Sequence, residues 1–535
     1  MRKYVKYLLA GALVLVACIA AAITMANISI ANISTPSGSQ EVHRAPVPTV
    51  QHNDETLSVT LPNYYTSGMV MQRGKPLTIK GKASAQGTLT ATMTDGKRTS
   101  SKTVRTAEDG SFTASLKALP TQLKPYSLTI TSGKTVVATV DQVYIGDVFL
   151  AAGQSNMEYG LRQYLLDPSI AQDSNGATVI NRADYPQPIS DKNIHFIITD
   201  DRTTNATVDS ELDLPLKDYC ADQWLPAVGT DATHLGYLPQ LFAEQVRERA
   251  SSVPVGIIQT AWGGTEIAPH MQGGAIFQHH IEPLEHMRLA AVLWYQGEDD
   301  ASSNDRALAY LHRFTTLINQ YRKVFDENDL PFLYVQLARY GKAPYTVVIR
   351  QAQTDALQTA DNTSNLGMTV TIDTDKGTST LIHPLGKDII ARRMADQWQA
   401  IQEGKTIPMG PIAEQAQAVD NDSGAVTISF AGSTGTGLTA MTPILTKEAT
   451  ADQYATPSTA SVEGFEAAGA DGKFVPADAV INSDGKTLTI TANGIDTIKQ
   501  VRYQWTGIPT QTPFLYNSSG LPASPFWLSV HRVLE

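Results

Sequence analysis

The chain has 535 residues, more than one ordinary hydrophobic core supports, and its length predicts several folded units. Its composition, 42% hydrophobic and 17% charged, is that of a folded protein and argues against extensive disorder. The formal net charge is -11, from 41 basic and 52 acidic residues. Because phosphate binding needs a clustered cationic surface, which is not seen beyond the N-terminus, this balance argues against a nucleic-acid partner.

Residues 1–26 are predicted to enter a membrane as a signal peptide or signal anchor. Arg2, Lys3 and Lys6 precede an uncharged, mostly apolar stretch that ends near Ala26. The basic end predicts a cytoplasmic N-terminus and an exported remainder, which is either anchored at the cell surface or secreted. The segment LVAC, which ends at Cys18, resembles a bacterial lipobox and would permit lipidation. The apolar run continues past this cysteine, however, and so favours an uncleaved anchor.

The next two segments contain no helical pattern. Residues 27–55 are polar and rich in Ser, Pro and Asn, which predicts a flexible linker. From 56 to 141, short alternating runs such as LTATMT and SLTITS predict a small antiparallel β-sandwich, with hairpin turns at Asp95-Gly96 and Asp109-Gly110. The two cysteines of the chain, at 18 and 220, do not supply a disulfide framework.

Residues 142–405 predict an α/β domain. Continuous apolar runs such as VYIGDVFLAA, VGIIQTAW and AVLWYQGE alternate with amphipathic helical patterns at 236–250 and 307–324. This alternation predicts a parallel sheet covered on both sides, with the functional site at the carboxyl ends of its strands. Residues 406–535 return to alternating runs, including AVTISF and KTLTITA, which predict a C-terminal β-rich domain.

Ser155, in AAGQSNMEYG, is a candidate nucleophile at the first of these strand ends. A serine hydroxyl needs a base in contact with it and donors for the developing oxyanion. Here a strand ends, Gly153 permits a tight turn, and Ser155 lies where a helix begins, with unpaired backbone N–H groups. Taken alone, a serine at this position is more typical of a helix cap.

Three other strand ends carry candidates of their own. Gly263 and Gly264 in TAWGGTE allow outward-facing N–H groups, although such a pair is also typical of a simple turn. In YQGEDD, Gln296 can donate an amide N–H and Glu298 can orient neighbours, although a solvated acidic loop has the same composition. Among the 11 histidines, His383 in TLIHPLGKD is the best placed base, since it follows the last strand and precedes a helix.

Two other kinds of site are disfavoured. A metal site would have to use the four competing histidines, which are His270, His279, His280 and His286. These histidines lack acidic or cysteine residues that would complete a set of metal ligands. The α/β-hydrolase nucleophile motif requires G-x-S-x-G, and Met157 occupies the position of its second glycine.

The ordered blocks GQSNM, WGGT, WYQGE and IHP resemble the sialate O-acetylesterases, a branch of the SGNH hydrolases related to carbohydrate acetylesterases. The segments MVMQRGKPLTIKG, PFLYVQLARY and VRYQWTGIP also resemble this family, so the resemblance spans about residue 56 to the C-terminus. It implies a flavodoxin-like, three-layer SGNH hydrolase domain with a parallel sheet, flanked by β-rich modules. It also implies a serine mechanism that requires no cofactor and no metal.

The resemblance implies that Ser155 is the nucleophile and His383 the general base and then general acid. Many SGNH enzymes have an aspartate three residues before the histidine, where this chain has Thr380. Asp375, with Asp373 as the alternative, is the candidate acid that orients the histidine. A backbone carbonyl could do the same in a Ser-His dyad.

The implied oxyanion hole consists of the Ser155 N–H, an N–H from the Gly263-Gly264 turn and the Gln296 side chain. Three further residues are expected to support the site: Gln154, Asn156 and Glu298.

Three functions follow from these features. The first is an exported esterase that removes O-acetyl groups from sialic acids or related glycans. The second is an esterase of acetylated polysaccharide such as xylan, because the shared blocks serve acetyl transfer and do not identify the sugar. The third is a noncatalytic glycan-binding surface protein, for which the absent aspartate is the only support.

Overall fold

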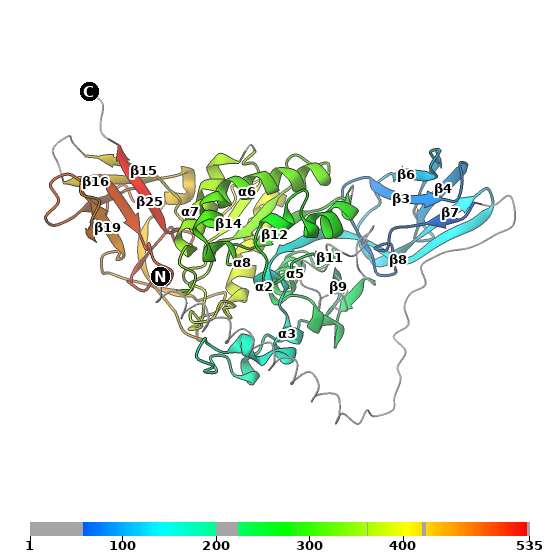
Figure 1. The fold of residues 1–535 in the computed structure, drawn as a ribbon. Helices are drawn as coiled ribbons and strands as arrows, with labels where there is room; N and C mark the ends of the chain where they lie inside the picture. Colours follow the sequence, from blue (N-terminus) through cyan, green and yellow to red (C-terminus); the bar gives the residue numbers. More distant parts are fainter. Residues whose placement is uncertain (1–56, 199–222, 286, 361, 420–423, 532–535) are drawn as a thin grey trace, which may run out of the picture. The chain divides into compact units, whose positions relative to one another are not determined.

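A computed structural model describes residues 57–198, 223–285, 287–360, 362–419 and 424–531 (Figure 1). The expected signal segment, the possible lipidation site at Cys18 and the linker to residue 55 lie outside the described residues, as do Cys220 and His286. Within the described ranges, no helix combines the length and apolar character needed to span a membrane.

Two small sheets form the N-terminal module. In β6, SFTASL alternates between exposed and buried residues, because successive side chains of a strand point to opposite faces of the sheet. The first sheet contains β1 (Val59–Thr60), β3 (Leu77–Ala83) and β6 (Ser111–Leu116). The second contains β4 (Thr88–Thr94), β5 (Thr99–Arg105), β7 (Gln122–Ser132), β8 (Thr135–Gly153) and β2 (Val70–Gln72).

Strand β8 belongs to both this module and the central sheet. It is 19 residues long. Its first half pairs antiparallel with β7, whereas its last residues pair in parallel with β11 (Val255–Gln259) and β12 (Ala291–Tyr295). Between the halves, Gln142 has a φ of +54°, an unusual conformation for a residue other than glycine. The predicted boundary between residues 141 and 142 therefore falls inside a continuous strand.

The central sheet has the strand order β10-β9-β11-β8-β12-β13-β14. Its remaining strands are β9 (Asp191–Ile198), β10 (Leu225–Ala227), β13 (Phe332–Val335) and β14 (Leu366–Thr369). All neighbouring pairs along this order are parallel except β10 with β9. Every residue of β11, β12, β13 and β14 is buried, which explains the continuous apolar runs of the sequence.

Helices cover both faces of this sheet (Figure 1). Helix α5 (Tyr237–Arg249) packs on α8 (Lys387–Gln402), and α6 (Asn304–Val324) packs on α7 (Thr346–Thr359). Phe149 of β8 meets Phe242 of α5 at 4.9 Å between ring centroids, and Trp294 of β12 meets Phe314 of α6 at 6.1 Å. Because Phe149 pairs with Ala291, three residues before Trp294, the two aromatic side chains point to opposite faces. The chain is thus a mixed α/β protein with several sheets.

The C-terminal module contains the remaining strands and has a hydrophobic core of its own, which includes Val426, Ile490 and Phe526. One sheet has the order β20-β19-β23-β25-β15-β16-β22-β21, and a second has the order β18-β17-β24. The strands are β15 (Ala413–Ala418), β16 (Ala425–Phe430), β17 (Thr439–Pro443), β18 (Ala455–Pro457), β19 (Phe465–Ala468), β20 (Phe474–Pro476), β21 (Asp478–Ile481), β22 (Leu488–Thr491), β23 (Gln500–Tyr503), β24 (Phe514–Tyr516) and β25 (Phe526–His531).

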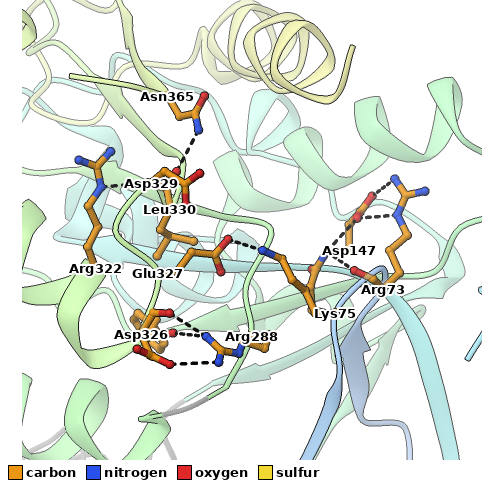
Figure 2. Close-up of polar contacts among 12 residues, drawn as sticks. Arg73, Lys75, Asp147, Arg288, Arg322, Asp326, Glu327, Asp329, Leu330 and Asn365 are labelled. Carbon is orange, nitrogen blue, oxygen red and sulfur yellow. Dashed lines mark hydrogen bonds and ion pairs between the residues drawn. The ribbon is translucent and has the colours of Figure 1, made fainter. Parts of the chain in front are cut away.

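Ion pairs join the segment between β2 and β3 to the α/β domain (Figure 2). Arg73 donates from Nε and Nη2 to the two carboxylate oxygens of Asp147 on β8, at 2.7 and 2.8 Å. Lys75 contacts Glu327, which follows α6, at 2.6 Å. Since Asp147 is buried and its partner is bidentate, the first pair contributes more to this junction than the more exposed second pair.

Candidate functional site

The turn after β8 fixes the position of Ser155. Gly153 has a φ of +124°, and a Cβ atom on it would lie 2.2 Å from the Tyr295 carbonyl oxygen, so only glycine fits. The N–H of Gln154 donates to the same carbonyl at 2.9 Å. Ser155 then begins the short helix α2 (Ser155–Glu158), where first-turn N–H groups have no intrahelical acceptor.

Ser155 and His383 are in hydrogen-bond contact, although 228 residues separate them in sequence. The serine Oγ lies 2.8 Å from Nε2 of His383, in the loop between β14 and α8. The ring of Tyr159 packs against the imidazole with centroids 4.8 Å apart. Burial and the nearby Lys387 ammonium lower the pKa of His383 to about 3, so the imidazole is neutral at neutral pH. A neutral imidazole with its proton on Nδ1 accepts the serine proton at Nε2.

Neither aspartate proposed to orient the histidine contacts it. Asp375 is fully buried and accepts hydrogen bonds from Arg339 at 2.5 Å and from the Gly377 N–H at 2.8 Å. Asp373 is bound by both terminal nitrogens of Arg393, at 2.8 and 2.7 Å, and by the Tyr516 hydroxyl at 3.0 Å.

The expectation that Asp375, or else Asp373, orients His383 is therefore not met, because arginine ion pairs hold both carboxylates elsewhere. The backbone-carbonyl alternative is not found either, since Nδ1 of His383 has no hydrogen bond to another described residue.

A buried network around Asn156 links the nucleophile to the histidine loop. The Asn156 amide donates to Glu298 and, at 2.9 Å, to the carbonyl of Ile382, the residue before His383. Lys387, at the start of α8, donates to the Asn156 side-chain oxygen. Asn156 thus holds the loop of the base from the position next to the nucleophile.

The two charged members of this network have shifted pKa values. Burial raises the pKa of Glu298 and lowers that of Lys387, and each group partly offsets the shift of the other. Lys387 is absent from the sequence-based list of site residues. A lysine in the first turn of an amphipathic helix is usually solvated, so the residue pattern carries no sign of its burial.

The two N–H groups of the Gly263-Gly264 turn differ in whether they already have a protein acceptor. The Gly263 N–H donates to the Glu158 carboxylate at 2.6 Å. Gly264 has a φ of +71° and open space around its Cα, and its N–H makes no hydrogen bond within the described part of the chain. Of the two expected donors, Gly264 is thus the one left accessible.

The Gln296 side chain is hydrogen-bonded within the core. Its side chain is fully buried, and the amide nitrogen donates to the Thr265 carbonyl at 3.1 Å and to Asp300 at 2.6 Å. The Tyr310 hydroxyl donates to its amide oxygen at 3.1 Å. Two protein acceptors thus occupy the amide nitrogen that was expected to donate to the oxyanion.

The side-chain amide of Gln154 is hydrogen-bonded to the loop after β12. Its amide nitrogen donates to Asp299 at 3.1 Å, and its amide oxygen accepts the Gly297 N–H at 3.2 Å. These contacts tie the end of β8 to the loop after β12.

Of the described histidines considered for a metal site, His270 and His280 are buried in the core. His270 is fully buried, with Nε2 2.8 Å from the Thr265 hydroxyl, and burial lowers its pKa to about 3. Over the ranges that the structure describes, no group of three His, Cys, Asp or Glu residues is arranged to hold a metal ion.

A small pocket of about 10 Å³ opens at the nucleophile. Its lining includes Ser155, Asn156, Tyr159 and His383, together with Tyr237 of α5. A serine nucleophile with a neutral base at 2.8 Å, in a pocket lined by aromatic rings, is suited to acyl transfer.

Comparison with known proteins points to the same chemistry. A family model described as "Carbohydrate esterase, sialic acid-specific acetylesterase" matches residues 145–396. Sialate O-acetylesterases of Mus musculus and Rattus norvegicus are each 24% identical to the chain, with 88% of this chain and 94% of each relative covered. The solved structure of a carbohydrate acetylesterase from Xanthomonas citri has a TM-score of 0.69 at 26% identity, covering 88% of this chain and 99% of that chain.

The family match includes both partners of the Ser155–His383 contact and all the parallel strand pairs of the central sheet. Residues 145–396 therefore resemble the sialic acid-specific acetylesterases among the carbohydrate esterases, and the chain is a carboxylic ester hydrolase.

Proposed function

We propose that the protein is a serine esterase that removes O-acetyl groups from sialic acids or related glycans. The observation that carries the proposal is the 2.8 Å contact between Ser155 Oγ and His383 Nε2. The family match and the sialate O-acetylesterase relatives support the substrate class. The parallel sheet with helices on both faces supports a flavodoxin-like SGNH hydrolase core.

The reaction proceeds through an acetyl-serine intermediate. Ser155 Oγ attacks the acetyl carbonyl carbon while its proton passes to Nε2 of His383. The bond to the sugar oxygen then breaks, and His383 returns the proton to that oxygen, which leaves as a hydroxyl. Water next attacks the acetyl-enzyme with the same base, and acetate and the free serine result.

Backbone N–H groups are the proposed oxyanion donors. Within the described residues, neither the Ser155 N–H nor the Gly264 N–H donates to a protein acceptor. Each such donor contributes about 3 kcal/mol of transition-state stabilisation. The proposal therefore replaces the Gln296 amide with backbone donors.

The histidine acts as one half of a Ser-His dyad in this proposal. Pro384 stiffens the loop after it, and Asn156 holds the carbonyl before it at 2.9 Å. Restraint from both sides substitutes for the carboxylate that orients histidine in a triad.

The decisive experiment replaces Ser155 with alanine and measures acetate release from O-acetylated sialic acid. Ser303→Ala is the matched control, because Ser303 likewise lies at the start of a helix, directly before α6, and its side chain makes no capping bond. We expect the first variant to lose hydrolysis and the control to retain it. Full activity of Ser155→Ala would refute the mechanism.

An acetylesterase of other carbohydrates is the second candidate. It is favoured by the similarity to a carbohydrate acetylesterase from Xanthomonas citri, whose description names no sialic acid. Initial rates on O-acetylated sialic acid and acetylated xylan distinguish the two candidates.

Export is part of the proposal and is supported by the basic and apolar residues of segment 1–26. Cell fractionation with an antibody to the C-terminal module tests it, and recovery of the whole protein in the cytoplasm would contradict it.

A further inference from the structure

The pocket at Ser155 is too small for a sugar. Its volume is about 10 Å³, which is room for about one water-sized group, whereas ligand pockets usually measure about 300–1,000 Å³. A glycan that carries an acetyl ester to Ser155 must therefore lie mostly outside this pocket.

A larger open cavity adjoins this pocket. It has a volume of about 500 Å³, and it shares the side chains of Tyr237 and Leu385 with the nucleophile pocket. The cavity therefore lies directly beside the nucleophile pocket, and its size is that of a ligand site.

The cavity combines an apolar wall with cationic groups. Tyr237 and Leu385 supply apolar surface, while Lys376 and Lys447 supply ammonium groups and Asp184 one carboxylate. Lys376 is bound to a carboxylate on α8 at 2.8 Å. Lys447 is exposed and has no carboxylate within ion-pair distance in the described part of the chain. Lys447 is therefore the cation available to an anionic ligand.

One loop carries both the cavity wall and the base. The Thr378 hydroxyl donates to the Asp375 carbonyl at 2.5 Å and accepts the Leu385 N–H at 3.1 Å, which braces the loop on either side of His383. Lys376 in this loop has a φ of +51°, a strained conformation of the kind that clusters at ligand sites. A sugar in the cavity would thus rest on the loop that positions the histidine.

We infer that this cavity is the sugar subsite and that it takes an acidic sugar, with the ring against Tyr237 and the carboxylate directed to Lys447. The inference rests on the proposed function, because it assigns a place to the part of the substrate that Ser155 does not hold. It also gives the C-terminal module, which contributes Lys447, a direct contact with substrate.

The test compares three acetyl esters with the full-length protein: O-acetylated sialic acid, an O-acetylated neutral hexose, and p-nitrophenyl acetate, which has no sugar. For each variant, kcat/KM on each sugar ester is divided by kcat/KM on p-nitrophenyl acetate. This ratio cancels any general loss of folded enzyme. Lys102→Met, on the exposed face of β5, removes a charge far from the cavity lining and is the control.

Lys447→Met should lower the ratio for the acidic sugar at least about tenfold, mainly through KM, and change the ratio for the neutral hexose less than about twofold. Thr446→Trp, which places a large ring at the cavity lining, should lower both sugar ratios at least about tenfold. Lys102→Met should alter neither ratio.

Equal losses on the two sugars in Lys447→Met would overturn the carboxylate contact. Unchanged sugar ratios in Thr446→Trp would overturn the cavity as the subsite. If the unmodified protein hydrolyses p-nitrophenyl acetate but neither sugar ester, the proposed function fails, and that failure is recognised before any variant is made.

Discussion

Two groups of polar residues lie at the carboxyl edge of the same parallel sheet, and they differ in what they contact. Ser155 and His383 contact each other and line an open pocket. Gln296, Asp373 and Asp375 are fully buried, and every contact reported for their side chains is to the protein interior. A strand-end position brings a residue near the site, whereas its local hydrogen-bond partners decide whether it is available to substrate.

The largest expected effect concerns the pair that faces the pocket. Ser155→Ala and His383→Ala should each lower kcat at least about a thousandfold, because neither group acts without the other. The double variant should be no slower than the slower single variant, as measured by acetate release under substrate saturation. Multiplicative losses in the double variant would show that the two residues act independently.

The two aspartates should behave as structural ion-pair partners. Removing one partner of a buried pair costs about 3–5 kcal/mol, so Asp373→Asn and Asp375→Asn should lower the unfolding free energy by this amount. The folded variants should retain kcat/KM within about tenfold, whereas loss of a triad aspartate costs about 10⁴-fold. Urea unfolding and steady-state kinetics give both values, with Asp396→Asn, in a more exposed pair, as the control. A large kinetic loss at full stability would restore the catalytic-acid role.

Gln296→Leu should also affect stability more than catalysis. It leaves the partners of the buried amide unsatisfied, at a cost of about 1–3 kcal/mol, and should slow turnover less than about tenfold. Removal of a true oxyanion donor would instead slow turnover about 10²–10³-fold. Gln336→Leu, a buried glutamine after β13, is the matched control. The result that would reverse our interpretation is a hundredfold slower enzyme with unchanged thermal stability.

The smallest expected effect is a shift in pH dependence. The positive charge of Lys387 disfavours the imidazolium form and helps to lower the pKa of His383 to about 3. Lys387→Met removes that charge, so the pKa of His383 should rise, and the acid limb of kcat/KM should move to higher pH. Lys405→Met, at an exposed site, should leave the profile in place. An unchanged acid limb in Lys387→Met would mean that Lys387 only supports the network mechanically.

The class of the fold and the class of the enzyme could both be predicted from the sequence. Strand runs alternating with amphipathic patterns predicted a mixed α/β protein, and this is confirmed, with α6 at Asn304–Val324 close to the predicted 307–324. The esterase assignment and the family resemblance are confirmed by the family match. The turn at Gly153 was also readable, because a glycine between a strand and a helix has few other uses.

The tertiary structure decided which polar groups are available for chemistry. The Ser155–His383 contact spans 228 residues, and no local pattern states which strand ends meet. The arginines that occupy Asp373 and Asp375 come from α8 and from the loop after β13, so only the packed fold pairs them. Lys387 is buried because α8 starts beside Asn156. Periodicity records which face of an element is apolar, whereas the partner of a buried polar group depends on contacts between distant segments.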